Sequence, residues 1–207
     1  MLEIRRAGEP DFWSEYRKTH ASGKYDDLSD TEEGVEIRRR LRIAMLQSQY
    51  YLCAYCCKQI SAENSMNEHI KPKGLSQYVN NSMDYDNLIA CCKTEGKNAT
   101  CSAAKRNIYD EKLFVSPLQE ECSKHFRFYT NGIIEGVTKA GKYTVELLNL
   151  NAYHLQKARG AQYKAALSCH SSELVKQSFL TPDEEGKLES YADFISFFYD
   201  RGYFTVE

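Results

Sequence analysis

Four cysteines in the first half of the chain are spaced to bind a metal ion. Cys53 and Cys56 are separated by two residues, and Cys92 and Cys101 follow later in the chain. A structural zinc ion takes four soft ligands in a tetrahedron, and a two-residue gap lets one tight turn supply two of them. Six of the eight cysteines lie within residues 53–101, which favours a metal site over a set of buried thiols. We therefore predict that these four cysteines bind a structural zinc ion.

The remaining cysteines are predicted to pack as small apolar residues. Cys91 and Cys92 compete for one ligand position. We choose Cys92, because it lies further from the apolar strand that precedes the pair and nearer to the expected turn. Cys57, Cys122 and Cys169 are expected to be ordinary interior residues.

Between the two cysteine pairs lie residue types that phosphodiester hydrolysis requires, Glu68, His69 and Asn87. A carboxylate such as Glu68 can hold a divalent cation, which neutralises the scissile phosphate and the leaving oxygen. A neutral imidazole can take a proton from the attacking water. A lone histidine is usually a core or surface residue, but the position of His69 between the halves of a metal site favours a catalytic role. We predict that the Asn87 side-chain carbonyl accepts a hydrogen bond from the second ring nitrogen and so fixes the tautomer.

These residues belong to a pattern that resembles the HNH endonuclease family, whose fold is called ββα-metal. The matching motifs are Cys53-x2-Cys56, Glu68-His69-Ile70-x-Pro72, Tyr85-Asp86-Asn87-Leu88, Cys92 and Cys101-x3-Lys105. More narrowly, the chain resembles the PtuB-type HNH nuclease subunit of Septu and retron-linked anti-phage defence systems. This narrower resemblance also uses Phe114-Val115-Ser116-Pro117-Leu118, Phe126-Arg127-Phe128 and Leu147-Leu148-Asn149-Leu150-Asn151. Together the segments cover about residues 35–165.

The resemblance implies a role for each residue of the predicted site. His69 would be the general base, Asn87 its orienting partner and Glu68 a ligand of catalytic Mg²⁺ or Mn²⁺, while the four cysteines would hold the structural zinc. In many HNH proteins a His or Asn after the last zinc cysteine supplies a second ligand of the catalytic metal. Here that position is Ser102, a weak ligand, so the second ligand is in question. Lys105, one turn later, is a candidate to contact the phosphate instead.

The resemblance also implies a reaction and partners. The expected reaction is hydrolysis of a phosphodiester bond, which leaves a 5′-phosphate and a 3′-hydroxyl. DNA is the favoured substrate, and RNA, particularly tRNA, stays open. The expected partner is an ABC/SMC-like ATPase of the PtuA type, with a retron reverse transcriptase and its non-coding RNA/DNA as further partners. Two non-catalytic alternatives stay open: a zinc-ribbon binding module with a decayed site, which Ser102 supports, and an adaptor that delivers nucleic acid to the ATPase.

Length and composition indicate a globular protein. The chain has 207 residues, of which 42% are hydrophobic and 27% are charged, and this balance argues against wholesale disorder. The net charge of −2 argues against a protein that coats nucleic acid by charge alone, so a partner would supply part of the affinity. No signal peptide or membrane-spanning stretch is visible. We therefore expect a cytoplasmic protein with reduced cysteines and no membrane partner.

The elements that must position the site predict an α+β protein in three regions. Residues 1–50 form an N-terminal helical arm, residues 51–110 the HNH nuclease core with the zinc, and residues 111–207 a region of one hairpin and helices that is a possible partner-docking region. Within the core, residues 68–70 are predicted as a short strand and residues 102–108 as a short helix.

Helical periodicity is clearest in the N-terminal arm. Residues 9–19 are a short amphipathic candidate, and a longer helix begins near Thr31. The apolar stripe of this helix consists of Ile37, Leu41, Ala44 and Met45. Its opposite face carries four arginines, Arg38, Arg39, Arg40 and Arg42. These arginines are either a solvated surface or a set of phosphate contacts, and the sequence weighs both equally.

The C-terminal region is predicted to combine one hairpin with two helices. Residues 125–129 and 133–137 are strand-like and joined across Asn131-Gly132, a strong hairpin signal. Asn151 is predicted to cap one helix, and the motif at 181–184 to begin the final one. Six aromatic residues crowd the end of the chain, and part of this group is predicted to dock the ATPase. They are Phe194, Phe197, Phe198, Tyr199, Tyr203 and Phe204.

Overall fold

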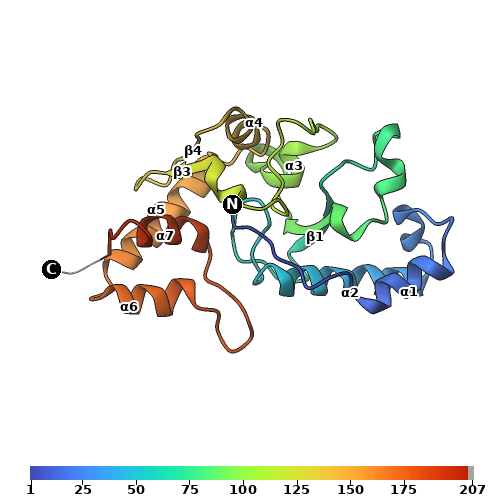
Figure 1. The fold of residues 1–207 in the computed structure, drawn as a ribbon, viewed down its shortest axis with the longest axis horizontal. Coiled ribbons are helices and arrows are strands. Elements are labelled where there is room, and N and C mark those ends of the chain that lie inside the picture. Colours follow the sequence, from blue (N-terminus) through green and yellow to red (C-terminus); the bar gives the residue numbers. More distant parts are fainter. Residues whose placement is uncertain (205–207) are drawn as a thin grey trace.

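The computed structural model describes residues 1–204 and shows a mixed arrangement of helices and small sheets, as expected for an α+β protein. The helices are α1 (Asp11–Thr19), α2 (Glu32–Ser48), α3 (Cys101–Lys105), α4 (Lys139–Leu147), α5 (Tyr153–Leu167), α6 (Ser172–Val175) and α7 (Ala192–Tyr199). The strands are β1 (Ser65–His69), β2 (Leu88–Cys92), β3 (Phe126–Phe128) and β4 (Ile134–Gly136). In Figure 1, α1 and α2 lie at one end of the molecule and α5 to α7 at the other. Among residues 1–204, no helix is long and apolar enough to cross a membrane.

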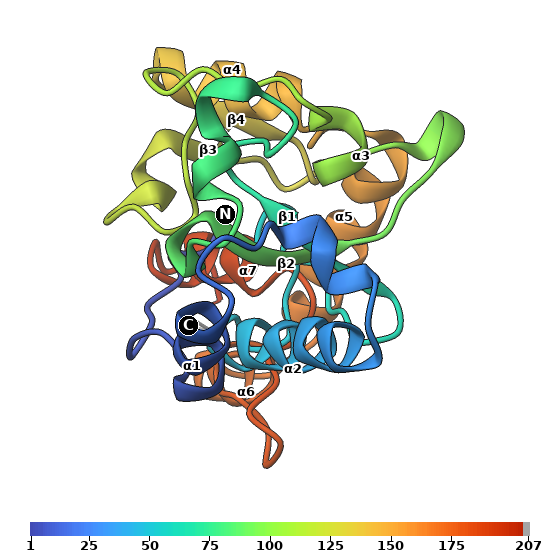
Figure 2. The same cartoon turned by 90° about the vertical axis from the view of Figure 1, so that its right-hand side faces the viewer.

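Strands β1 and β2 form an antiparallel pair at the centre of the molecule. His69 lies opposite Leu88 and Glu68 opposite Ile89, and every residue of β2 is buried. Helix α2 packs against both strands, and α3, the next α-helix along the chain, packs against β2. Figure 2 shows the two strands between α2 and α4. The predicted strand and short helix of the core are therefore present, with slightly different ends.

Helix α2 begins where the sequence predicts. The hydroxyl of Thr31 accepts a hydrogen bond from the backbone N–H of Gly34 at 3.0 Å, which caps the helix. Gly34 also permits a close approach, because a Cβ atom there would lie 2.5 Å from the carbonyl oxygen of Leu28. This contact packs the 3₁₀ helix η1 (Tyr25–Ser29) against α2. The predicted stripe is buried at Ile37, Leu41 and Met45, and half-buried at Ala44.

The predicted hairpin is confirmed as β3 and β4, an antiparallel pair. Gly132 takes a positive φ of 87° in the turn, a backbone conformation that favours glycine. The prediction that Asn151 caps the next helix is wrong. Its side chain bonds the backbone of Ile134 in β4 instead, as acceptor at 2.9 Å and donor at 2.8 Å, and α5 starts after Ala152 without a side-chain cap.

The final helix starts later than predicted. Residues 181–191 form a loop in which the Asp183 carboxylate accepts from the backbone N–H groups of Glu185 and Lys187, at 2.9 and 2.8 Å. The carboxylate therefore stabilises a turn rather than a helix N-terminus. Helix α7 begins at Ala192, directly after Tyr191, whose φ is 64°.

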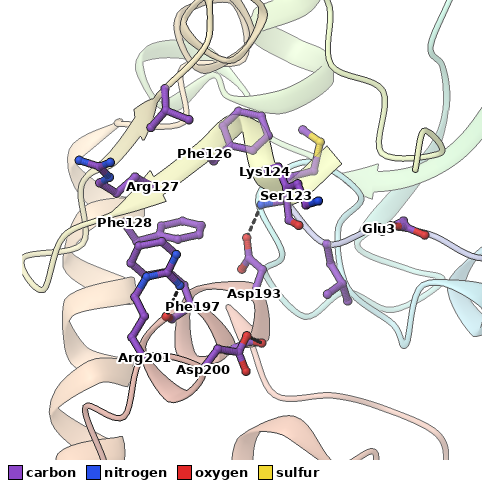
Figure 3. A pocket seen from close by; sticks show the side chains of 14 residues that line it. Glu3, Ser123, Lys124, Phe126, Arg127, Phe128, Asp193, Phe197, Asp200 and Arg201 are labelled. Atoms are coloured by element: carbon purple, nitrogen blue, oxygen red, sulfur yellow. Dashed lines mark hydrogen bonds and ion pairs between the residues drawn. The ribbon is translucent and has the colours of Figure 1, made fainter. Parts of the chain in front are cut away.

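Most of the C-terminal aromatic residues pack inside the protein rather than forming an outer surface. Phe194 and Phe198 of α7 are buried and contact the ring of Tyr163 in α5. Of the six aromatic residues, Tyr203 alone is more than half exposed, at 54%. Figure 3 shows the neighbouring pocket of about 450 Å³, where Phe197 of α7 lies against Phe128 of β3 and the carboxylate of Asp193 accepts a hydrogen bond from the N-terminal amine.

Candidate nuclease and metal site

Cys53, Cys56, Cys92 and Cys101 form one buried cluster in which all four sulfur atoms lie within 4.8 Å of one another. The Sγ atoms of Cys53 and Cys101 are 3.8 Å apart, and those of Cys56 and Cys92 are 3.9 Å apart. Tetrahedral zinc with Zn–S bonds of about 2.3 Å requires sulfur separations of about 3.8 Å. The geometry therefore fits a single zinc-sized ion, which four thiolates would bind as a cross-link between distant parts of the chain.

Of the two adjacent cysteines, Cys92 is the one that lies in this cluster, as the predicted ligand set requires. Cys91 is also buried, but it lies outside the four-sulfur group because adjacent strand residues point to opposite faces. Burial alone would raise the pKa of the Cys53 thiol, but hydrogen bonds with neighbouring thiols, first among them that of Cys101, bring this pKa well below its ordinary value. A thiolate, the metal-binding form of cysteine, is therefore favoured at Cys53.

His69 lies at the end of β1, with 6% of its surface exposed. Its Nε2 atom lies 2.9 Å from the main-chain carbonyl oxygen of Ser82. A carbonyl oxygen can only accept, so Nε2 carries the proton and Nδ1 keeps its lone pair. The ring of Tyr25, from η1, meets the imidazole edge-on at 4.6 Å between centroids. Burial lowers the pKa of His69 to about 4, so the imidazole is neutral near pH 7.

Asn87 does not bond the imidazole, so the prediction that it orients His69 directly is wrong. Its Oδ1 accepts from the backbone N–H of Lys71 at 2.7 Å, and its Nδ2 donates to the carbonyls of Lys71 and Asn81. The side chain thus bonds the two ends of the segment between residues 71 and 81. Because that segment leads directly to Ser82, Asn87 acts on His69 through the backbone.

Glu68 lies against α3. Its Oε2 accepts from the hydroxyl of Ser102 at 2.5 Å, and its Oε1 accepts from the ammonium of Lys105 at 2.9 Å and from the hydroxyl of Tyr55 at 3.4 Å. Lys105 donates a further hydrogen bond to the main-chain carbonyl of His69, at 2.9 Å. Ser102 and Lys105, the two residues of α3 that the HNH pattern singled out, therefore both contact Glu68. Both act as hydrogen-bond donors to its carboxylate, which is not the predicted arrangement.

Two expectations about these residues change. Lys105 is fully buried, so it is not placed to contact a phosphate as predicted. The hydroxyl of Ser102 donates its proton in a hydrogen bond to the carboxylate of Glu68, so Ser102 contacts Glu68 as a donor and not as a neighbouring metal ligand. Because both oxygens of Glu68 already accept hydrogen bonds, one from an ammonium, these side chains do not fit a divalent cation as they stand.

The four arginines on α2 all contact other side chains or backbone groups of the protein. Arg42 donates to the side chain of Asn67 at 2.9 Å and to the carbonyl of Ala62 at 3.0 Å. The other three arginines contact, in sequence order, Ser29, Glu36 and the ring of Phe12. These contacts favour a structural role over phosphate binding.

A cleft of about 700 Å³ opens beside Ser82, between α1 and residues 79–84. The basic side chains that line it are Arg17, Lys18, His20 and Lys24. Neither this cleft nor the contact between Tyr25 and His69 was visible in the sequence, because both depend on how the N-terminal arm folds over the loop. The Ser82 carbonyl is a main-chain group, and no residue type marks it.

Comparisons with known proteins identify relatives of this chain, although no family model matches it. It is 34% identical over 139 residues to the "Retron Vc95 putative HNH endonuclease" of Vibrio cholerae serotype O1 biovar El Tor, and this match covers 63% of the chain and 65% of that protein. A protein named in the same way for retron Ec83 of Escherichia coli is 26% identical over 201 residues, covering 77% of the chain and 78% of that protein. "Septu protein PtuB" of Bacillus thuringiensis is 29% identical over 114 residues, which are 54% of the chain and 41% of that protein. The match thus spans less than two thirds of the Vibrio and Bacillus proteins. The chain is therefore a homologue of two proteins that carry the name "putative HNH endonuclease" of a retron and of a protein named Septu PtuB.

Proposed function

We propose that the chain is the HNH endonuclease subunit of an anti-phage defence complex, with a ββα-metal core formed by β1, β2 and α3. The observation that carries this proposal is the state of His69. The Ser82 carbonyl fixes its Nε2 proton, which leaves Nδ1 as a neutral base. Three relatives whose names refer to HNH endonucleases or to PtuB support the same reaction.

In the proposed reaction Nδ1 of His69 accepts a proton from a water molecule, whose oxygen attacks the phosphorus atom. The bond to the 3′ oxygen breaks as the new bond to phosphorus forms, this oxygen takes a proton from a second water molecule, and the products are a 5′-phosphate and a 3′-hydroxyl. Asn87 contributes by holding the loop that ends at Ser82. Zinc in the four-cysteine cluster would fix the turn at Cys53 and the start of α3 relative to β2.

The resemblance assigns Mg²⁺ or Mn²⁺ to Glu68, with Ser102 as a doubtful second ligand. Such an ion would stabilise charge on the phosphate when bound. The contacts of Glu68 require Lys105 to move before the ion could bind, so no step of the proposed reaction depends on it.

Nucleic acid is the proposed substrate, with DNA favoured and tRNA or other RNA as the alternative. The cleft beside Ser82 supports this, because its basic side chains are suited to phosphate groups. Aspartate and glutamate also line the cleft, at Asp84 and Glu9, so its attraction for a polyanion is moderate. A partner that adds positive surface would complete the binding site.

The proposed partner is an ABC/SMC-like ATPase of the PtuA type, acting with this chain in the cytoplasm. A retron reverse transcriptase and its non-coding RNA/DNA are further proposed partners, supported by the retron names of two relatives. The second candidate function is a non-catalytic, zinc-containing adaptor that presents nucleic acid to the ATPase. The engagement of Glu68 by Lys105 favours this candidate, because it removes a free metal ligand.

Cleavage and binding assays on the complex with the ATPase separate the two functions. We compare the wild type with His69→Gln and with His154→Gln, an exposed histidine on α5 that serves as control. Plasmid DNA and total tRNA are the substrates. Loss of the base should slow cleavage at least about 100-fold in His69→Gln, and binding should be equal in all three proteins.

Equal cleavage by the wild type and His69→Gln would contradict the assignment of the base. Binding of nucleic acid without cleavage by the wild type, on both substrates, would support the adaptor. Cleavage of one substrate only would identify that substrate.

A further inference from the structure

A lysine side chain of the protein, that of Lys105, supplies a positive charge next to the carboxylate of Glu68. The ammonium of Lys105 lies 2.9 Å from Oε1 of Glu68 and 2.9 Å from the main-chain oxygen of His69. The side chains of Lys105 and Glu68 are only 1% and 10% exposed. Carboxylate and carbonyl oxygens are also the groups that hard divalent cations prefer, so the ammonium occupies a position that such a cation would need.

The position of Lys105 depends on the cysteine cluster, because Lys105 lies on a helix that begins at one of the four cysteines. Cys101 is the first residue of α3 and one of the four clustered cysteines, and Lys105 follows four residues later on the same face of the helix. An ion in the cluster would therefore fix the point from which Lys105 extends. The ring of Phe114 lies 6.0 Å from the ammonium and 5.9 Å from the ring of Tyr55, so aromatic side chains border the ion pair.

A divalent cation and the ammonium cannot share Glu68 easily. The single negative charge of the carboxylate is already balanced by Lys105, and two like charges in a buried region repel strongly because little water screens them. In the cysteine cluster, four ligand atoms lie within 4.8 Å of one another and could share one metal ion, whereas the ligand atoms at Glu68 already hold an ammonium.

We propose that Lys105 is the resident cation of the nuclease centre and excludes Mg²⁺ and Mn²⁺ from Glu68 in the resting protein. Lys105 is then a positioning residue: it neutralises Glu68 and holds the carbonyl at the end of β1, next to the imidazole of His69. That this centre is a nuclease site rests on the proposed function, whereas the exclusion of divalent cations does not.

Mn²⁺ binding tests the proposal without reference to cleavage. The zinc-loaded full chain is titrated with MnCl₂ by calorimetry, as wild type, Glu68→Gln, Lys105→Met and the double variant. Methionine keeps most of the length of lysine and removes its charge. The zinc content and circular dichroism of each variant report whether it folds.

We expect the wild type and Glu68→Gln to bind Mn²⁺ with equal, weak affinity. Lys105→Met should bind it at least tenfold more tightly than the wild type, and the double variant should lose this gain. Tighter binding by the wild type than by Glu68→Gln would overturn the proposal, as would a folded Lys105→Met that gains no Glu68-dependent affinity. If Lys105→Met does not fold, the comparison of wild type with Glu68→Gln still decides: equal binding supports exclusion and unequal binding refutes it.

The outcome is independent of the cleavage assay. Failure of the wild-type complex to cleave nucleic acid would remove the proposed function and leave the Mn²⁺ result standing. Glu68-dependent Mn²⁺ binding by the wild type would remove this proposal and leave the role of His69 intact.

Discussion

The imidazole of His69 is oriented by the main-chain carbonyl of Ser82, at 2.9 Å from Nε2, and not by an amide side chain. Asn87 donates to the carbonyl of Asn81, the residue directly before Ser82, at 2.9 Å. The asparagine therefore sets the position of the carbonyl, and the carbonyl sets the tautomer. Two hydrogen bonds, Asn87 to Asn81 and His69 to Ser82, therefore orient the imidazole, where the sequence predicted a single bond between Asn87 and His69.

Acid should destabilise the protein through His69. Its folded pKa of about 4 lies below the ordinary value of 6.5, so the unfolded chain takes up the proton first as the pH falls. The contribution of the neutral His69 imidazole to the free energy of unfolding is therefore fully present above pH 6.5, and it is lost as the pH falls from 6.5 to about 4. Relative to His69→Gln, the free energy of unfolding should fall by about 2 kcal/mol between pH 6.5 and 5. Urea unfolding measures this, and an imidazole ¹⁵N titration midpoint of 6 or higher would contradict it.

Replacing Asn87 with alanine should destabilise the loop before Ser82. The change removes three hydrogen bonds to backbone groups of Lys71 and Asn81, at a cost of about 2–3 kcal/mol in the free energy of unfolding. Faster hydrogen exchange should follow across residues 70–82. Asn80→Ala, at an exposed position of the same loop, is the control and should cost less than about 0.5 kcal/mol. Equal effects of the two variants would rule out the anchoring role of Asn87.

Loss of one clustered cysteine should unfold the centre of the molecule. Cys53→Ser removes one ligand of the proposed zinc ion, and the melting temperature should fall by about 10 °C or more, together with the zinc content. Cys91→Ser is a matched control, because Cys91 is equally buried but lies outside the cluster. Elemental analysis should find about one zinc per chain in the wild type and in this control. Full zinc content in Cys53→Ser would refute the predicted ligand set.

Removing the ring of Tyr25 should expose His69. The Tyr25 ring covers the imidazole edge-on, and its hydroxyl accepts from the side chain of Asn67 at 2.7 Å. Tyr25→Ala should therefore increase the rate at which diethyl pyrocarbonate modifies His69 at least about fivefold, as measured by mass spectrometry. Tyr25→Phe keeps the ring and should leave the rate near that of the wild type. An unchanged rate in Tyr25→Ala would show that another group covers the imidazole.

The sequence predicted best those features that depend on local spacing. The pairing of Cys53 with Cys56, the start of α2 at Thr31 and the turn at Asn131-Gly132 are all set by neighbouring residues, and all are present. The partners of Asn87 and Asn151 were predicted wrongly. An amide side chain can bond any backbone group within reach, and tertiary packing decides which one.

Lys105 shows a second limit of sequence-based prediction. A lysine one turn after a predicted zinc ligand is expected to be exposed, since lysine is rarely buried without a partner. Its burial becomes favourable only when Glu68 and the carbonyl of His69 meet it, and both come from a strand far earlier in the chain. The relative positions of α3 and β1 are therefore needed before this ion pair can be foreseen.

The backbone N–H of Tyr191 donates to the carbonyl of Cys57 at 2.6 Å, and that of Leu188 donates to the carbonyl of Tyr50 at 3.1 Å. These two bonds attach the loop before α7 to the turn that carries Cys53 and Cys56. The turn that carries Cys53 and Cys56 should therefore melt together with helix α7 in one cooperative transition. A shortened recombinant fragment ending before residue 188 would lose that support, so fragments of this kind are poor substitutes for the intact chain.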